Sequence, residues 1–194
     1  MKISHRTWRY QNYKEGGKVG TGTRDHLLVL NSIINKYKNK NTPLNIVFLD
    51  VEKAYDRGDF ELILHVMRER GCNMEDWVYM DALNENNKVK IKTTFGLTSD
   101  IQTGTIIKQG GVLSPIQFSL LIDEIGKNLA CKDKGLILIE QGVPCLLWVD
   151  DIVTMHTELE EVQVMLDIIY EMSNKYNYKF GMDKSKHLIS HWKK

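Results

Sequence analysis

Apolar and polar positions along the chain predict helices separated by short strands. Apolar residues at helical spacing predict a helix over residues 25–38, and an apolar face predicts another after Thr157. Ser114 and Pro115 are typical of an N-cap and a first helical position, and Thr157 with Glu160 forms a capping box. The predicted helices comprise residues 25–38, 59–70, 74–84, 116 to about 130, and the segment that carries Val162, Met165, Leu166 and Ile169.

Short apolar or alternating runs between these helices predict strands. Residues 44–49 form an apolar run suited to a buried strand. Alternation over residues 88–93, followed by turn residues at Gly96 and at Ser99–Asp100, predicts a hairpin. A second hairpin is predicted around a turn at Gln141–Gly142, and it continues into the runs VPCLLWV and IVTM. Strands in hairpins with helices packed on one side indicate an α+β fold.

Length and composition are those of one ordinary globular domain. The chain has 194 residues, of which 42% are hydrophobic and 26% charged. No apolar run is long enough to span a bilayer and the N-terminus lacks the apolar stretch of a signal peptide, so we expect an intracellular protein without a membrane partner. Cys72, Cys131 and Cys145 are far apart, and we expect reduced, mostly buried thiols.

Charge is distributed unevenly although the net charge is only +1. Residues 1–43 contain nine Lys or Arg and two acids, an excess of seven. Residues 158–171 contain five acids and no base. This distribution suits a phosphate backbone held beside a cation site, and it equally suits solvated faces.

Two adjacent aspartates, Asp150 and Asp151, interrupt the second apolar hairpin. Neighbouring side chains of a straight strand point to opposite faces, so a shared site requires a tight turn between Val149 and Ile152. Asp50 ends the strand at 44–49 in the same way. If the two strands lie side by side, three carboxylates meet at one end of a sheet, where Mg²⁺ would relieve their repulsion. The alternative is that all three are unrelated turn residues.

A glycine-rich loop lies between these acids. Residues 108–115 read KQGGVLSP and precede a predicted helix. Gly110 and Gly111 permit a close approach of the backbone, and a helix N-terminus offers N–H groups to phosphate or base. Such loops are common, so this one indicates a function only together with the motifs that precede and follow it.

Four segments in this order resemble the reverse transcriptase family, most closely the enzymes of non-long-terminal-repeat (LINE-type) retrotransposons. FLDVEKAYD at 48–56 resembles motif A, and KQGGVLSP with the following QFSLLIDEI resembles motif B. LLWVDDIV at 146–153 resembles motif C, although Trp148 stands where Tyr or Phe is usual, and KFGMDKSK at 179–186 resembles motif D. The resemblance runs from about Gly22 to the C-terminal end. It implies a palm-like antiparallel sheet with helices on one face and partial fingers.

The resemblance also implies a role for each matching residue. Asp50 and Asp150 would bind two Mg²⁺ ions, or Mn²⁺ in their place, and Asp151 would complete the acidic site. Tyr55 matches the aromatic residue that rejects a ribonucleotide 2′-hydroxyl. The remaining substrate contacts would come from Gln109 and Gly110, which match residues touching the incoming nucleotide and template, and from Lys184, which matches a lysine near the leaving phosphates.

The implied partners are an RNA template, a DNA primer and deoxynucleoside triphosphates. We expect one reverse transcriptase domain over residues 1–194, with partial fingers at about 1–43 and the palm at about 44–194. No segment resembles a primer grip, thumb or endonuclease, so we expect these to be absent and other segments or chains to supply the thumb and the rest of the fingers.

Three hypotheses follow from the sequence. The first is an RNA-directed DNA polymerase that transfers deoxynucleotides to a primer 3′ end by two-metal catalysis. The second is a truncated or decayed reverse transcriptase fragment that binds nucleic acid without autonomous catalysis. The third is an unrelated α+β structural protein, and it predicts that Asp50 and Asp150 lie far apart.

Overall fold

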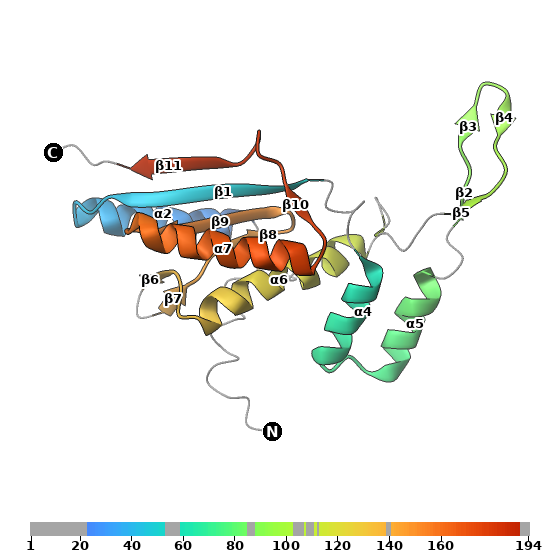
Figure 1. The fold of residues 1–194 in the computed structure, drawn as a ribbon, viewed down its shortest axis with the longest axis horizontal. Helices are drawn as coiled ribbons and strands as arrows, with labels where there is room; N and C mark the ends of the chain where they lie inside the picture. The colour runs from blue at the N-terminus through green and yellow to red at the C-terminus, as the bar shows by residue number, and fades with distance from the viewer. Residues whose placement is uncertain are drawn as a thin grey trace.

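A five-stranded antiparallel sheet forms the centre of the molecule (Figure 1). The computed structural model describes residues 23–52, 59–84, 88–102, 107, 111, 113–138 and 141–190. Strand β1 (Leu44–Glu52) lies in the middle, with β9 (Asp151–His156) and then β8 (Leu146–Trp148) on one side. On its other side β1 pairs with β10 (Lys179–Phe180) and β11 (Lys186–Ser190). The predicted strand at 44–49 is therefore confirmed, and it extends to Glu52.

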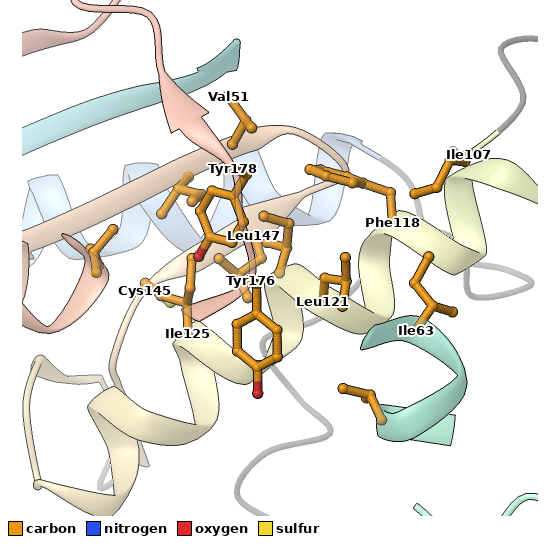
Figure 2. Packing of buried hydrophobic residues seen from close by; sticks show 14 of the residues in the cluster. Val51, Ile63, Ile107, Phe118, Leu121, Ile125, Cys145, Leu147, Tyr176 and Tyr178 are labelled. Carbon is orange, nitrogen blue, oxygen red and sulfur yellow. The ribbon is translucent and has the colours of Figure 1, made fainter. Parts of the chain in front are cut away.

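Helices α6 (Ser114–Cys131) and α7 (Leu159–Lys175) cover one face of this sheet (Figure 1). Helix α4 (Phe60–Glu69) packs on α6, and α5 (Met74–Asn84) packs on α4. Figure 2 shows the resulting core, in which α6 directs Phe118, Leu121 and Ile125 toward Leu147 of β8. Phe118, Leu121 and Ile125 are fully buried, so each contributes about 1.5–3 kcal/mol of transfer free energy. The predicted α+β class is confirmed, and α6 and α7 do pack on one face, but the expectation that all helices lie on one side is wrong because α2 (Thr23–Asn39) covers the other face.

Helix α2 (Thr23–Asn39) packs on the opposite face of the sheet, which the sequence did not predict. Its fully buried Ile33 joins Leu44 and Ile46 of β1 and Met155 of β9 in a second core cluster. Because side chains alternate along a strand, the other residues of β1, such as Val51, face the first cluster under α6. The sheet is thus covered on both sides at this end, while the boundary between fingers and palm at residue 43 stays a prediction.

Two hairpins lie outside the central sheet. Strands β2 (Lys88–Val89), β3 (Lys92–Thr93), β4 (Gly96–Leu97) and β5 (Ile101–Gln102) form the hairpin predicted from residue 88 onward. It projects beyond α4 and α5 (Figure 1). Strands β6 (Leu136–Leu138) and β7 (Gln141–Val143) form the other. The predicted turn at Gln141–Gly142 is wrong, because both residues lie in β7 and the connection falls at 139–140, outside the described residues.

The N-caps of α6 and α7 each lie one residue from their predicted positions. Ser114 is the first residue of α6 and its N-cap is Leu113, which has a helical backbone. Glu158 is the N-cap of α7, and no side chain caps that helix. The Glu158 N–H instead donates to His156 Nδ1 (3.1 Å), so the Thr157–Glu160 capping box is wrong. None of the described helices is long and apolar enough to cross a bilayer.

The three thiols have different environments, so the prediction of mostly buried cysteines holds for Cys145 alone. Cys72 is half-buried and Cys131 is exposed. Burial raises the pKa of the Cys145 thiol, which keeps it protonated and unreactive. We expect a maleimide to modify Cys131 in the native protein and Cys145 only after unfolding, as read by mass spectrometry of tryptic peptides. Equal labelling of both thiols in the native state would contradict this.

Candidate active site

Asp150 lies in the tight turn that joins β8, at one edge of the sheet, to β9. Strands β8 and β9 pair with Trp148 opposite Asp151, so Val149 and Asp150 form a two-residue turn. The sequence predicted a turn between Val149 and Ile152; the structure has a turn here, but it ends at Asp150, and Asp151 is already the first residue of β9. Val149 has a φ of 52°, which is rare for a β-branched residue and costs on the order of 1–3 kcal/mol. The surrounding structure maintains this conformation, in part because the Val51 N–H donates to the Asp150 carbonyl (3.2 Å).

Asp50 lies directly opposite Asp151 in the β1–β9 ladder. Cross-strand partners have Cβ atoms about 4.5–5.5 Å apart on the same face of a sheet. By strand alternation this is the face covered by α2, because Ile46 in β1 and Met155 in β9 belong to the cluster around Ile33. The predicted meeting of the two strands is confirmed. The hypothesis that these acids are unrelated turn residues far apart is wrong.

The acidic residues influence one another electrostatically. Burial raises the pKa of Asp151, and the negative charges of Asp150 and Asp50 raise it further. The positive charge of Lys184 acts in the opposite direction. Ionised Asp151 is therefore held at a free-energy cost that a nearby cation would remove.

The turn at residues 181–185, which connects β10 to β11, lies against Asp50. The Gly181 N–H donates to the Asp50 carbonyl (2.9 Å), and the Asp50 N–H makes a long bond to Ser185 Oγ (3.4 Å). The Lys184 ammonium contacts Asp50 Oδ2 (3.3 Å). A Cβ on Gly181 would lie 3.2 Å from the same carboxylate oxygen. Lys184 was identified from the sequence, whereas Gly181 and Ser185 were not, although both lie within the motif D segment.

A cavity of about 380 Å³ lies beside the carboxylates. Its lining includes Leu27, Leu30, Phe48, Trp148, Asp50 and Asp151. The Trp148 ring makes an edge contact with His26 of α2, with ring centroids 5.5 Å apart. Burial lowers the pKa of His26. The cavity thus joins an apolar surface between α2 and the sheet to the acidic residues.

The donor set suits a hard divalent cation. In the described part of the chain, no three His, Cys, Asp or Glu side chains are gathered closely enough to hold a metal ion. Mg²⁺ does not require such a cage, because it is usually bound by one or two carboxylates together with waters and substrate phosphates. Asp50 and Asp151, opposite each other with Asp150 adjacent, fit that pattern in number and chemistry.

The other sequence-predicted site residues, Tyr55, Gln109 and Gly110, lie outside the described residues. Their roles stay predictions. Ile107, directly before the glycine-rich loop, is buried in the first core cluster. Within the loop, the Gly111 carbonyl accepts a bond from the Ser114 N–H (3.2 Å).

Asp151→Asn is expected to raise the melting temperature at neutral pH by about 1–2 °C, a small value because the site is solvent-screened. The raised pKa of Asp151 means that its ionised form destabilises the folded state. The gain should therefore be present at neutral pH and vanish as pH falls through the raised folded pKa toward the unfolded value. Thermal unfolding followed by circular dichroism at several pH values measures it. A gain that is independent of pH would contradict the charge repulsion.

Comparison with known proteins agrees with this geometry. Residues 11–193 match the family described as reverse transcriptase (RNA-dependent DNA polymerase). The chain is 25% identical over 151 residues to a retrovirus-related Pol polyprotein from the type-1 retrotransposable element R2 of Nasonia vitripennis, which covers 78% of the chain and 15% of that protein. An R2 polyprotein of Popillia japonica is 26% identical over 137 residues, covering 69% of the chain and 22% of that protein.

The fold is shared with a more distant solved structure. A telomerase from Candida albicans, solved in complex with a fragment of telomeric RNA, superposes with a TM-score of 0.68 at 12% identity. The alignment covers 93% of this chain and 31% of the telomerase. This likeness supports the palm-like fold. With the family match over nearly the whole sequence, we conclude that the chain belongs to the reverse transcriptase (RNA-dependent DNA polymerase) family.

Proposed function

We propose that the chain is the RNA-directed DNA polymerase domain of a non-long-terminal-repeat retrotransposon polyprotein. The observation that supports this best is the register that sets Asp50 opposite Asp151, with Asp150 in the adjoining turn. The chain spans only 15% and 22% of the length of the two R2 relatives. Other segments of a longer protein would therefore supply the thumb and the remaining fingers. The protein would act inside the cell, where its RNA templates are found.

The proposed reaction joins a deoxynucleotide to a primer 3′ end and releases pyrophosphate. Asp50 and Asp150 would bind two divalent cations, Mg²⁺ or Mn²⁺, and Asp151 would add negative charge to the site. Cations held there would supply positive charge to the oxygens on which negative charge develops during transfer. The contribution of the chain is mainly positioning and charge, which is what phosphoryl transfer requires.

The substrate contacts follow from the motifs. Tyr55 would exclude a ribonucleotide 2′-hydroxyl, and Gln109 with Gly110 would contact the incoming nucleotide and the template. Lys184 would approach the leaving phosphates. The family description, RNA-dependent DNA polymerase, supports RNA as the template, and the basic segment at 1–43 suits a phosphate backbone.

A second candidate is a decayed copy that binds nucleic acid without catalysis. A single-turnover assay with excess RNA template, DNA primer and one deoxynucleotide separates the two candidates. Extension of the primer by one nucleotide supports the polymerase, whereas binding of the duplex without extension supports the decayed copy.

Asp150→Asn is expected to weaken Mn²⁺ binding at least about tenfold, because it removes one of few charged ligands. Isothermal titration calorimetry of the wild-type chain and the variant measures this. Asp133→Asn is the matched control, since Asp133 is an exposed aspartate in the turn that follows α6. Equal Mn²⁺ affinity of the wild type and Asp150→Asn would overturn the proposed metal site.

A further inference from the structure

The turn at 181–185 holds Asp50 through backbone groups on both sides of that residue. The Gly181 N–H bonds to the Asp50 carbonyl, and Ser185 Oγ receives the Asp50 N–H. Ser185 is fixed in turn, because its hydroxyl donates to the Gly181 carbonyl (2.9 Å) and its N–H bonds to the same oxygen (2.9 Å). The backbone that carries Lys184 is therefore tied to Asp50 independently of the Lys184 side chain.

The Lys184 side chain is the exposed member of this arrangement. Its ammonium lies 3.3 Å from Asp50 Oδ2, yet the side chain is 73% exposed, whereas that of Asp50 is 24% exposed. An exposed side chain can leave its partner without disturbing the packing around it. Exposed ion pairs shift equilibria by up to about fivefold, so the contact is weak enough to be exchanged. The same ammonium also acts on Asp151.

One carboxylate oxygen cannot serve a divalent cation and this ammonium equally well. A cation that approaches Asp50 Oδ2 repels the Lys184 charge at close range. The tethered backbone keeps the displaced ammonium within a side-chain length of the acids. Phosphate oxygens that arrive with the cation are then the nearest negative groups available to it.

We propose that Lys184 is the resident counter-ion of Asp50, and that it gives up this carboxylate when a divalent cation binds and turns toward the phosphates of the nucleotide. This inference rests on the proposed function and adds a step to it. Lys184 opposes binding of the cation alone and favours binding of the cation together with a triphosphate. The site thereby discriminates against a cation that arrives without its nucleotide.

Lys186 provides a matched control. It has the same charge, lies two residues away in the chain and is exposed. Its ammonium donates to the Asp183 carbonyl (2.6 Å), whereas that of Lys184 contacts Asp50 Oδ2. Removing it changes the net charge as much as removing Lys184, so any difference between the two variants reports the contact with Asp50.

The test is calorimetric titration of Mn²⁺, without nucleotide, into the wild type, Lys184→Gln, Lys184→Arg and Lys186→Gln. Lys184→Gln is expected to bind Mn²⁺ about two- to fivefold more tightly than the wild type. Lys184→Arg should restore the wild-type affinity, and Lys186→Gln should change it by less than about 1.5-fold because of screening. With saturating Mn²⁺, Lys184→Gln should bind a deoxynucleoside triphosphate more weakly.

The outcomes separate this inference from the proposed function. If Asp150→Asn weakens Mn²⁺ binding but Lys184→Gln leaves it unchanged, the exchange is wrong and the metal site stands. If Lys184→Gln and Lys186→Gln tighten Mn²⁺ binding equally, the effect is net charge and the exchange is also wrong. If Asp150→Asn binds Mn²⁺ as the wild type does, the metal site fails and the exchange fails with it.

Discussion

Asp50→Asn is expected to lower the single-turnover rate of nucleotide addition at least about a hundredfold, which is close to 3 kcal/mol of transition-state stabilisation. Asp50 contributes the carboxylate of the central strand, and its backbone is fixed by β9 and by the turn at 181–185. Asparagine has the same shape and keeps those backbone bonds. The loss would therefore come from charge and metal binding rather than from unfolding, and we expect the melting temperature to change by less than about 3 °C.

The measurement is rapid-quench primer extension on an RNA template with saturating enzyme. Glu52→Gln is the matched control, because Glu52 is an exposed acid two residues further along the same strand, opposite Lys179. It removes the same charge from the same strand, and we expect its rate to stay within about threefold of wild type. A rate for Asp50→Asn that is no lower than that of Glu52→Gln would contradict a catalytic role.

The spacing of apolar residues predicted the helices and the central strand well, because the buried side of each element must be apolar along its whole length. It did not predict the boundaries that depend on contacts remote in sequence. The hairpin of β6 and β7 illustrates this: Gly135 has a φ of 114°, and a Cβ there would clash with the Val143 carbonyl. That close approach sets where β6 begins, and no local turn signal at Gln141–Gly142 reveals it.

The candidate site was predictable in its residues and only partly in its geometry. Asp50 and Asp150 could be found because each interrupts or ends an apolar strand, and the motif order suggested that the strands are neighbours. The contact of Lys184 with Asp50 joins residues 134 positions apart and has no local signal. The position of α2 was not predictable either, since an apolar helix face shows that it is buried but not against which partner.

Arg70→Met is expected to destabilise the fold by about 2–3 kcal/mol and to lower the melting temperature by about 5–10 °C. Arg70 caps the C-terminal end of α4 and donates to Asp123 Oδ2 (2.5 Å) and Glu124 Oε1 (2.7 Å) of α6. The Glu124 side chain is only 10% exposed. Methionine keeps the apolar stem but leaves a buried carboxylate with fewer donors.

The pH dependence of the stability lost in Arg70→Met is a second test of the ion pair. Burial opposes ionisation of Glu124, but hydrogen bonds from Lys127 and Arg70 outweigh it, so its pKa is lowered. The stabilisation is therefore complete above the unfolded pKa and is lost as pH falls through the lowered folded value. The difference in melting temperature between wild type and Arg70→Met should shrink in acid. Thermal unfolding between neutral pH and acid, followed by circular dichroism, measures it.

Arg68→Met controls for loss of an arginine from the same helix end. Arg68 lies over the Trp77 ring at 4.7 Å, an exposed cation–π contact worth about 0.5–1 kcal/mol. If Arg70→Met lowers the free energy of unfolding no more than this control does, the ion pairs of Arg70 with Asp123 and Glu124 do not stabilise the fold. A larger cost would mean that Arg70 ties α4, which follows the motif A strand, to α6, which follows the glycine-rich loop. The spacing of those two motifs would then depend on an ion pair that does not line the cavity beside the aspartates.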